Sequence, residues 1–311
     1  MTPTRSRTAG RRLLLACLLA AFPFSSFSQP GTVESDPSVV RILPKNYPLN
    51  RIRVAAHEYP WSAIGLLTML GGRYSCTGTL IAERYVLTAA HCVFPVRNFP
   101  EEINFLGGYE QERYVAHSRA KKLHMSKAFR NPRPSPEVFA NDWALVELEK
   151  PIGRETGYLG WAYFDAGVLE KMGSGTGVFK VSGYRRDRRF VQTVDHQCRI
   201  TGFTADGKLI MHRCPITGGD SGGPVLLPYK NELLVVGVDV GVKAQRGPHL
   251  KRGEAREGYA VPSAAFRDKL TGLGIGGAPM GPSGNLTGRA GNAPLSPPRR
   301  QKPRLTTPSS R

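Results

Sequence analysis

Short apolar runs separated by turn-forming residues fill the middle of the chain, between residues 51 and 272. Apolar runs of this length, bounded by Gly, Pro, Asn or Asp, are typical of β-strands. Many short strands with turns between them indicate a barrel or a sandwich. The strands predicted in this way are Ile64–Leu70, Cys76–Ile81, Tyr85–Thr88, Trp143–Leu148, Leu209–Met211, Val225–Leu227 and Leu233–Val240.

Three local patterns add detail to this all-β prediction. Trp143–Leu148 carries apolar residues on both faces, as a buried strand does. Asp206-Gly207 is a hairpin-turn dipeptide between residues that can form strands. Near the end of the region, Ser263 could cap a short helix over Ala264–Leu270 that ends at Gly272.

The first 50 residues have a different pattern. Residues 1–28 combine a basic start, a short apolar core and small residues before a cut site, which together predict a signal peptide. The apolar core is too short to span a bilayer, and no other stretch is long and apolar enough to do so. Residues 29–50 are rich in proline and are predicted to be a propeptide or an extended lead-in. We therefore expect a secreted or periplasmic protein without a membrane span.

From residue 273 to 311 the composition shifts to Gly, Pro, Ser, Thr and Arg. Such a segment buries too little apolar surface to offset its ordering entropy, so we expect a disordered tail. No acidic residue occurs after residue 274, and the whole chain carries a formal net charge of +19. The tail therefore favours weak association with polyanions or a cell surface, and not a specific nucleic-acid site.

Cysteine usage agrees with export. Removing the signal peptide removes Cys17 and leaves an even number of cysteines, which predicts two disulfides in an oxidising compartment. No Cys-x-x-Cys pair is present, so neither a metal nor a redox site is expected. The remaining cysteines, which allow three pairings, are Cys76, Cys92, Cys198 and Cys214.

Three segments carry residues suited to nucleophilic catalysis: Thr88–Cys92, Asn141–Leu145 and Gly218–Pro224. A serine hydroxyl needs a base to take its proton, and histidine suits this role near neutral pH. The histidine in turn needs a carboxylate to orient it, and the developing oxyanion needs amide N–H donors. Glycines around Ser221 allow a tight turn that can present such donors. Asp142 directly precedes the predicted buried strand.

These segments resemble the motifs of the chymotrypsin/trypsin family of serine proteases, from about residue 54 to 271. Thr-Ala-Ala-His-Cys resembles the histidine motif, Asn-Asp-Trp-Ala-Leu the aspartate motif, and Gly-Asp-Ser-Gly-Gly-Pro the nucleophile motif. The resemblance implies Ser221 as nucleophile, His91 as general base and Asp142 as the group that orients it. It also implies an oxyanion hole formed by the N–H groups of Gly219 and Ser221.

The same resemblance implies a fold and a disulfide pattern. The implied fold is two antiparallel six-stranded β-barrels with a short C-terminal helix, and the site lies between the barrels. The family pairing implies Cys76–Cys92. Cys198 and Cys214 are then left, and they could face each other across a hairpin that turns at Asp206-Gly207.

The sequence departs from the trypsin-like pattern around the nucleophile. Cys214 stands seven residues before Ser221, a spacing that resembles the glutamyl-endopeptidase-like (V8-like) branch. That branch usually has Asn before the serine, whereas this chain has Asp220. In trypsin-like zymogens an aspartate at this place pairs with a new N-terminus, so cleavage at Arg51-Ile52 or Arg53-Val54 is a hypothesis. A second hypothesis is that Asp239 faces the specificity pocket and favours Lys or Arg; the alternative is an outward-facing strand acid.

The combined interpretation is a secreted serine endopeptidase that acts on protein or peptide substrates and needs no cofactor. Two alternatives stay open. The protein could be a catalytically silent binding protein with a protease fold, or a polyanion-binding surface protein that acts through its basic tail. The other candidate carboxylates precede no comparable buried strand; they are Asp165, Asp187 and Asp195. The remaining histidines have no motif support and are interpreted as surface or packing residues; they are His57, His117, His124, His196, His212 and His249.

Overall fold

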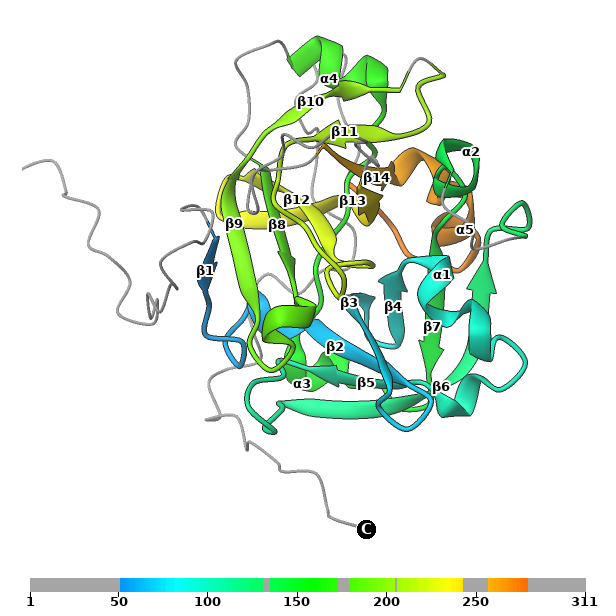
Figure 1. Ribbon diagram of the computed structural model, residues 1–311, viewed down its shortest axis with the longest axis vertical. Helices are drawn as coiled ribbons and strands as arrows, with labels where there is room; N and C mark the ends of the chain where they lie inside the picture. Colours follow the sequence, from blue (N-terminus) through cyan, green and yellow to red (C-terminus); the bar gives the residue numbers. More distant parts are fainter. Residues whose placement is uncertain (1–50, 131–134, 173–178, 205, 243–256, 279–311) are drawn as a thin grey trace, which may run out of the picture. The chain divides into compact units, whose positions relative to one another are not determined.

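A computed structural model describes residues 51–130, 135–172, 179–204, 206–242 and 257–278 (Figure 1). The predicted signal peptide, the predicted lead-in and residues 279–311 of the predicted tail lie outside these residues. The described part is dominated by antiparallel strands that form two sheets. Among the described residues, no helix is long and apolar enough to cross a membrane.

The first sheet is a closed barrel of six strands in the order β2-β3-β4-β7-β6-β5. It closes because β2 pairs with β3 along one edge and with β5 along the other. The predicted buried strand corresponds to β7, in which four of five residues are buried. The strands are β2 Ile64–Met69, β3 Tyr74–Ala82, β4 Tyr85–Thr88, β5 Asn104–Gly107, β6 Ala116–Met125 and β7 Ala144–Leu148.

The second sheet is curled but open, with eight strands in the order β1-β9-β8-β12-β13-β14-β11-β10. The all-β prediction with two barrel-like halves is confirmed, but this half is not the closed six-stranded barrel that we expected. Short strands at both edges, β1 and β10, extend the sheet instead of closing it. The strands are β1 Arg51–Arg53, β8 Phe179–Gly183, β9 Thr193–Cys198, β10 Ile200–Phe203, β11 Ile210–His212, β12 Pro224–Tyr229, β13 Glu232–Val242 and β14 Gly258–Pro262.

The predicted hairpin turn lies between β10 and β11, which pair antiparallel. Gly207 has a φ of +69°, and its N–H donates to the carbonyl oxygen of Thr204 at 2.8 Å. This left-handed conformation is costly for residues other than glycine, so the Asp-Gly dipeptide fits the turn.

The helices are short. The predicted C-terminal helix is present but begins later than expected, because Ser263 does not cap it. The Ser263 hydroxyl donates to the carbonyl oxygen of Ala162 at 2.7 Å, and residues 263–265 form a 3-10 turn before the helix. The α-helices are α1 Ala90–Val93, α2 Pro136–Phe139, α3 Gly153–Thr156, α4 Ala166–Met172 and α5 Arg267–Gly272.

The segment directly after α5 is packed, which corrects the predicted start of the tail at residue 273. Ile275 and Ala278 are buried. The indole N–H of Trp161 donates to the Ile275 carbonyl oxygen at 3.3 Å, and the Ala278 N–H donates to the Trp161 carbonyl oxygen at 2.8 Å. These contacts hold residues 275–278 against the segment that contains Trp161.

Candidate active site

His91 and Asp142 lie next to each other because of the register of two strands in the first barrel. β4 pairs antiparallel with β7, with Thr88 opposite Ala144. His91 follows β4 on the first turn of α1, and Asp142 comes two residues before β7. The pairing of β4 with β7 therefore places His91 and Asp142 at the same end of this strand pair.

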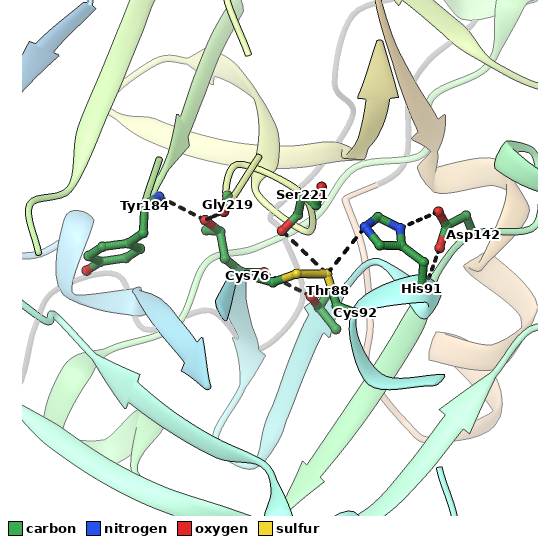
Figure 2. The surroundings of a disulfide bond; sticks show 9 residues. Cys76, Thr88, His91, Cys92, Asp142, Tyr184, Gly219 and Ser221 are labelled. Atoms are coloured by element: carbon green, nitrogen blue, oxygen red, sulfur yellow. Dashed lines mark hydrogen bonds and ion pairs between the residues drawn. A yellow bond between two sulfur atoms is a disulfide. The ribbon is translucent and has the colours of Figure 1, made fainter. Parts of the chain in front are cut away.

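Two contacts fix the imidazole on the carboxylate (Figure 2). His91 Nδ1 lies 2.6 Å from Asp142 Oδ2, and the backbone N–H of His91 donates to Asp142 Oδ1 at 2.7 Å. Asp142 is 1% exposed, whereas the His91 side chain is 28% exposed. The carboxylate is thus shielded from water, while the imidazole stays partly exposed.

Ser221 lies on a turn between β11 and β12, which we call the serine turn. This turn requires glycine at two positions. Gly219 has a φ of +93° and Gly222 a φ of +82°. A Cβ atom at Gly219 would fall against the carbonyl oxygen of Tyr184, and one at Gly222 would fall against the Thr88 hydroxyl. Both the backbone conformation and the close contacts therefore exclude larger residues.

Thr77 of β3 joins this turn to the first barrel. Its N–H donates to the Ser221 carbonyl oxygen at 2.9 Å, and its hydroxyl donates to the Gly219 carbonyl oxygen at 2.8 Å. The Tyr184 N–H in turn donates to the Thr77 hydroxyl oxygen at 2.9 Å. We did not single out Thr77 from the sequence, although a polar residue beside Cys76 in a buried strand could have signalled it.

The sulfur of Cys92 lies near both Ser221 and His91. This Sγ lies 3.7 Å from His91 Nε2 and 3.8 Å from the Ser221 carbonyl oxygen. Figure 2 shows the imidazole between Ser221 on one side and Asp142 on the other. Within the described part of the chain the Ser221 hydroxyl makes no hydrogen bond, and catalytic hydrogen bonds are often long before substrate binds.

The backbone amides around Ser221 fall into two groups. The N–H groups of Asp220, Gly222 and Gly223 donate to carbonyl oxygens within 3.0 Å. Among the described residues, the N–H groups of Gly219 and Ser221 have no acceptor. The turn therefore leaves two neighbouring donors available for a ligand.

Asp220 is buried beside Ser221 and pairs with Arg51, a residue of β1. The Asp220 side chain is 2% exposed and that of Arg51 is 0% exposed. Burial raises the pKa of the Asp220 carboxyl, while the guanidinium groups of Arg51 and Arg185 oppose this rise. In the sequence, Arg51 stands out only as a hypothetical cleavage site, because nothing local marks an arginine as a buried partner.

Asp239 is buried on β13 and is not an outward-facing strand acid. Its Oδ1 lies 2.8 Å from His212 Nε2, and both side chains are at most 1% exposed. His212 is therefore a buried partner of a carboxylate and not a surface residue. The Asp239 backbone also borders the serine turn, since its carbonyl oxygen accepts from the Gly222 N–H at 2.7 Å.

The structure joins Cys76 to Cys92 and Cys198 to Cys214. These are the two pairs that the sequence analysis predicts. Each disulfide lies close to a histidine, giving the clusters Cys76-His91-Cys92 and Cys198-His212-Cys214. Sulfur in a disulfide is not a thiolate, so these clusters do not offer the ligands that zinc requires.

Two antiparallel β-sheets that meet at a His–Asp pair and a serine turn define the chymotrypsin-like fold class. Residues 50–253 match the sequence profile of the trypsin family. This match covers more than half of the chain, and the chain therefore belongs to the trypsin family, a family of serine endopeptidases.

Individual relatives agree with this assignment. Human kallikrein-7 is 36% identical over 94 residues, which is 30% of this chain and 32% of that protein. A glutamyl endopeptidase of Bacillus licheniformis is 27% identical over 173 residues, or 54% of this chain and 49% of that protein. The chain thus spans half or less of the length of these relatives.

A solved structure of a Glu endopeptidase shares the fold. Its TM-score is 0.54 at 22% sequence identity, and the match covers 72% of this chain and 96% of that one. Similarity to both kallikrein-7 and glutamyl endopeptidases agrees with the mixture of trypsin-like and V8-like features around Ser221.

Proposed function

We propose that this protein is an endopeptidase in which Ser221, His91 and Asp142 form the catalytic triad. The Ser221 hydroxyl attacks the carbonyl carbon of a peptide bond while His91 Nε2 takes its proton. The same imidazole then gives that proton to the departing amine, leaving an acyl-enzyme that water hydrolyses. The observation that carries the proposal is the doubly held His91–Asp142 pair, in which Nδ1 faces the carboxylate, so that Nε2 is the ring nitrogen on the other side, where it would serve Ser221.

The two unused amides support the same proposal. In acyl transfer the carbonyl oxygen gains negative charge, and preorganised N–H donors stabilise it. The N–H groups of Gly219 and Ser221 belong to one turn and have no acceptor among the described residues. We assign them to the oxyanion hole.

The chain organisation follows from these assignments. The catalytic domain comprises residues 51–272 together with the packed segment to Ala278. We keep the signal peptide over residues 1–28, the lead-in over 29–50 and export from the cytoplasm as proposals. Two disulfides support export, because such bonds persist in oxidising compartments.

Active-site labelling tests the proposed function. Wild-type protein should react with a fluorophosphonate probe and cleave a peptide library, and Ser221→Ala should do neither. Ser75→Ala is a matched control, because Ser75 is a half-buried serine that belongs to β3 and not to the turn. It should be labelled like wild type.

The outcomes separate the alternatives. Correctly folded wild-type protein that is never labelled would favour a silent binding protein with a protease fold. Binding of a polyanion that disappears when residues 279–311 are deleted, without any peptidase activity, would favour the tail-directed alternative.

The preference at the cleaved bond stays a separate proposal. A buried carboxylate at Asp239, next to the serine turn, would favour Lys or Arg through charge pairing. The neighbouring His212 competes for this carboxylate. Peptide profiling of Asp239→Asn tests the idea, and an unchanged preference would reject it.

A further inference from the structure

The carboxylate of Asp220 shapes the turn that carries the proposed oxyanion donors. Asp220 Oδ2 accepts from the Thr217 N–H at 2.9 Å, and the Asp220 N–H donates to the Thr217 carbonyl oxygen at 3.0 Å. Gly219 lies inside this closed turn and Ser221 directly follows it. Any movement of the Asp220 side chain would therefore shift the amides of Gly219 and Ser221.

A buried carboxylate is costly unless a cation and hydrogen bonds compensate it. Arg51 supplies this cation from β1. Its Nη2 donates to Asp220 Oδ1, its Nη1 to the Pro215 carbonyl oxygen at 3.1 Å, and its Nε to the Thr193 hydroxyl oxygen at 2.9 Å. One guanidinium thus contacts both ends of the segment from Pro215 to Asp220.

The backbone of β1, like the Arg51 side chain, is hydrogen-bonded to the rest of the fold. β1 pairs antiparallel with β9, with Arg51 opposite Asp195 and Arg53 opposite Thr193. The Val54 N–H donates to the Gln192 carbonyl oxygen at 3.3 Å. The Arg51-Ile52 bond therefore lies inside a strand ladder, where a protease would have to open the ladder to reach it. Cutting there would also remove the backbone link between Arg51 and the rest of the catalytic domain.

We infer that Arg51 is a positioning residue. Its guanidinium holds Asp220 and thereby aligns the serine turn in a chain that is not cut after Arg51 or Arg53. No new N-terminus at Ile52 or Val54 is required for activity. This inference rests on the proposed function and replaces the hypothesis of activation by cleavage after Arg51 or Arg53.

The pH dependence of activity distinguishes a guanidinium from an amine. A guanidinium stays charged up to about pH 12, whereas an α-amino group has a pKa of about 8 and a lysine a pKa of about 10.4. Wild-type protein that is not cut after Arg51 or Arg53 should keep its rate of fluorophosphonate labelling between about pH 8 and 10. Arg51→Lys should keep part of this rate at pH 7 and lose it as the pH rises.

Substitution of the arginine should reduce turnover and not substrate binding. Arg51→Met should lower kcat by about 10²–10³-fold, the effect of losing one oxyanion donor, with little change in KM. Arg53→Met is the matched control, since Arg53 lies on the same strand but pairs with Glu110 and is 23% exposed. It should keep kcat within about twofold of wild type, as expected for a pair outside the site.

The N-terminus of the labelled protein provides a test that needs no variant. Mass spectrometry of wild-type protein carrying the fluorophosphonate should show a chain that still contains Arg51. A labelled species that begins at Ile52 or Val54 would overturn the inference, as would full activity of a folded Arg51→Met protein. If wild type is never labelled and cleaves no peptide, the proposed function itself fails, which is a distinguishable result.

Discussion

The two halves of the candidate site are held in different ways. On the His91 side the barrel ladder between β4 and β7 and one disulfide bring together segments of a single sheet. On the Ser221 side the turn depends on groups far away in the sequence. Arg51 is 169 residues from Asp220, and Thr77 is 142 residues from Gly219.

The partners of the two buried carboxylates differ as well. Asp142 contacts a partly exposed imidazole, the group that we propose as the general base. Asp220 contacts a fully buried guanidinium, which keeps its charge. In the proposed mechanism, one carboxylate therefore supports the proton transfer, while the other fixes the backbone where charge would develop.

The largest expected effect comes from the His91 side. Asp142→Asn preserves the shape of the side chain but removes the charge that orients and stabilises the imidazolium. We expect kcat to fall by about 10⁴-fold. Steady-state kinetics with a peptide substrate measure this, and a thermal unfolding curve close to that of wild type serves as the control. A loss of less than about tenfold would contradict the assignment of Asp142.

The next effect concerns stability on the Ser221 side. Arg51→Met removes the cation that contacts the buried Asp220 carboxylate and leaves Arg185 as the guanidinium that still lowers its pKa, which should cost about 3–5 kcal/mol of unfolding free energy. The double variant Arg51→Met/Asp220→Asn removes the uncompensated charge and should recover part of this loss. Urea denaturation followed by circular dichroism measures both. Equal stabilities of the single and double variants would show that the two side chains are not coupled.

The two disulfides test whether the halves respond differently to the same constraint. Each closes a loop with a sequence separation of 16, so each Cys→Ser pair should cost about 3 kcal/mol. Loss of Cys76–Cys92 should reduce kcat more than loss of Cys198–Cys214, because Cys92 Sγ contacts both His91 and Ser221. Denaturation and kinetics of the two double variants provide the comparison. Equal kcat losses would argue against a special role for this contact.

The smallest effect concerns His124 of β6. Burial lowers the pKa of its imidazole below 6.5, with Lys269 and Lys122 acting in the same direction and Glu147 against it. The native form therefore binds fewer protons than the unfolded chain, so stability falls as the pH drops below about 6.5. His124→Gln should flatten this decline when unfolding is measured between pH 8 and 5. An unchanged decline would contradict the prediction.

Much of the first barrel could be predicted because its core strands are apolar runs. Other strands were missed for a physical reason. The first half of β6 alternates buried and exposed residues, and its exposed positions are His117, Arg119, Lys121 and Lys122, so it lacks a continuous apolar run. The edge strand β1 is only three residues long and contains two arginines, a pattern that does not indicate a strand. The C-terminal helix was placed too early because the Ser263 hydroxyl binds a distant carbonyl instead of a helix terminus.

The sequence by itself determined the all-β class, the three motif residues His91, Asp142 and Ser221, and the glycines that their turn requires. These features depend on local chemistry, since a positive φ or a buried apolar run is recorded in neighbouring residues. Only the tertiary structure decided that Arg51 compensates Asp220, that His212 contacts Asp239, and that the second sheet stays open. Burial and charge pairing join residues that are far apart in the chain, so no local pattern specifies them.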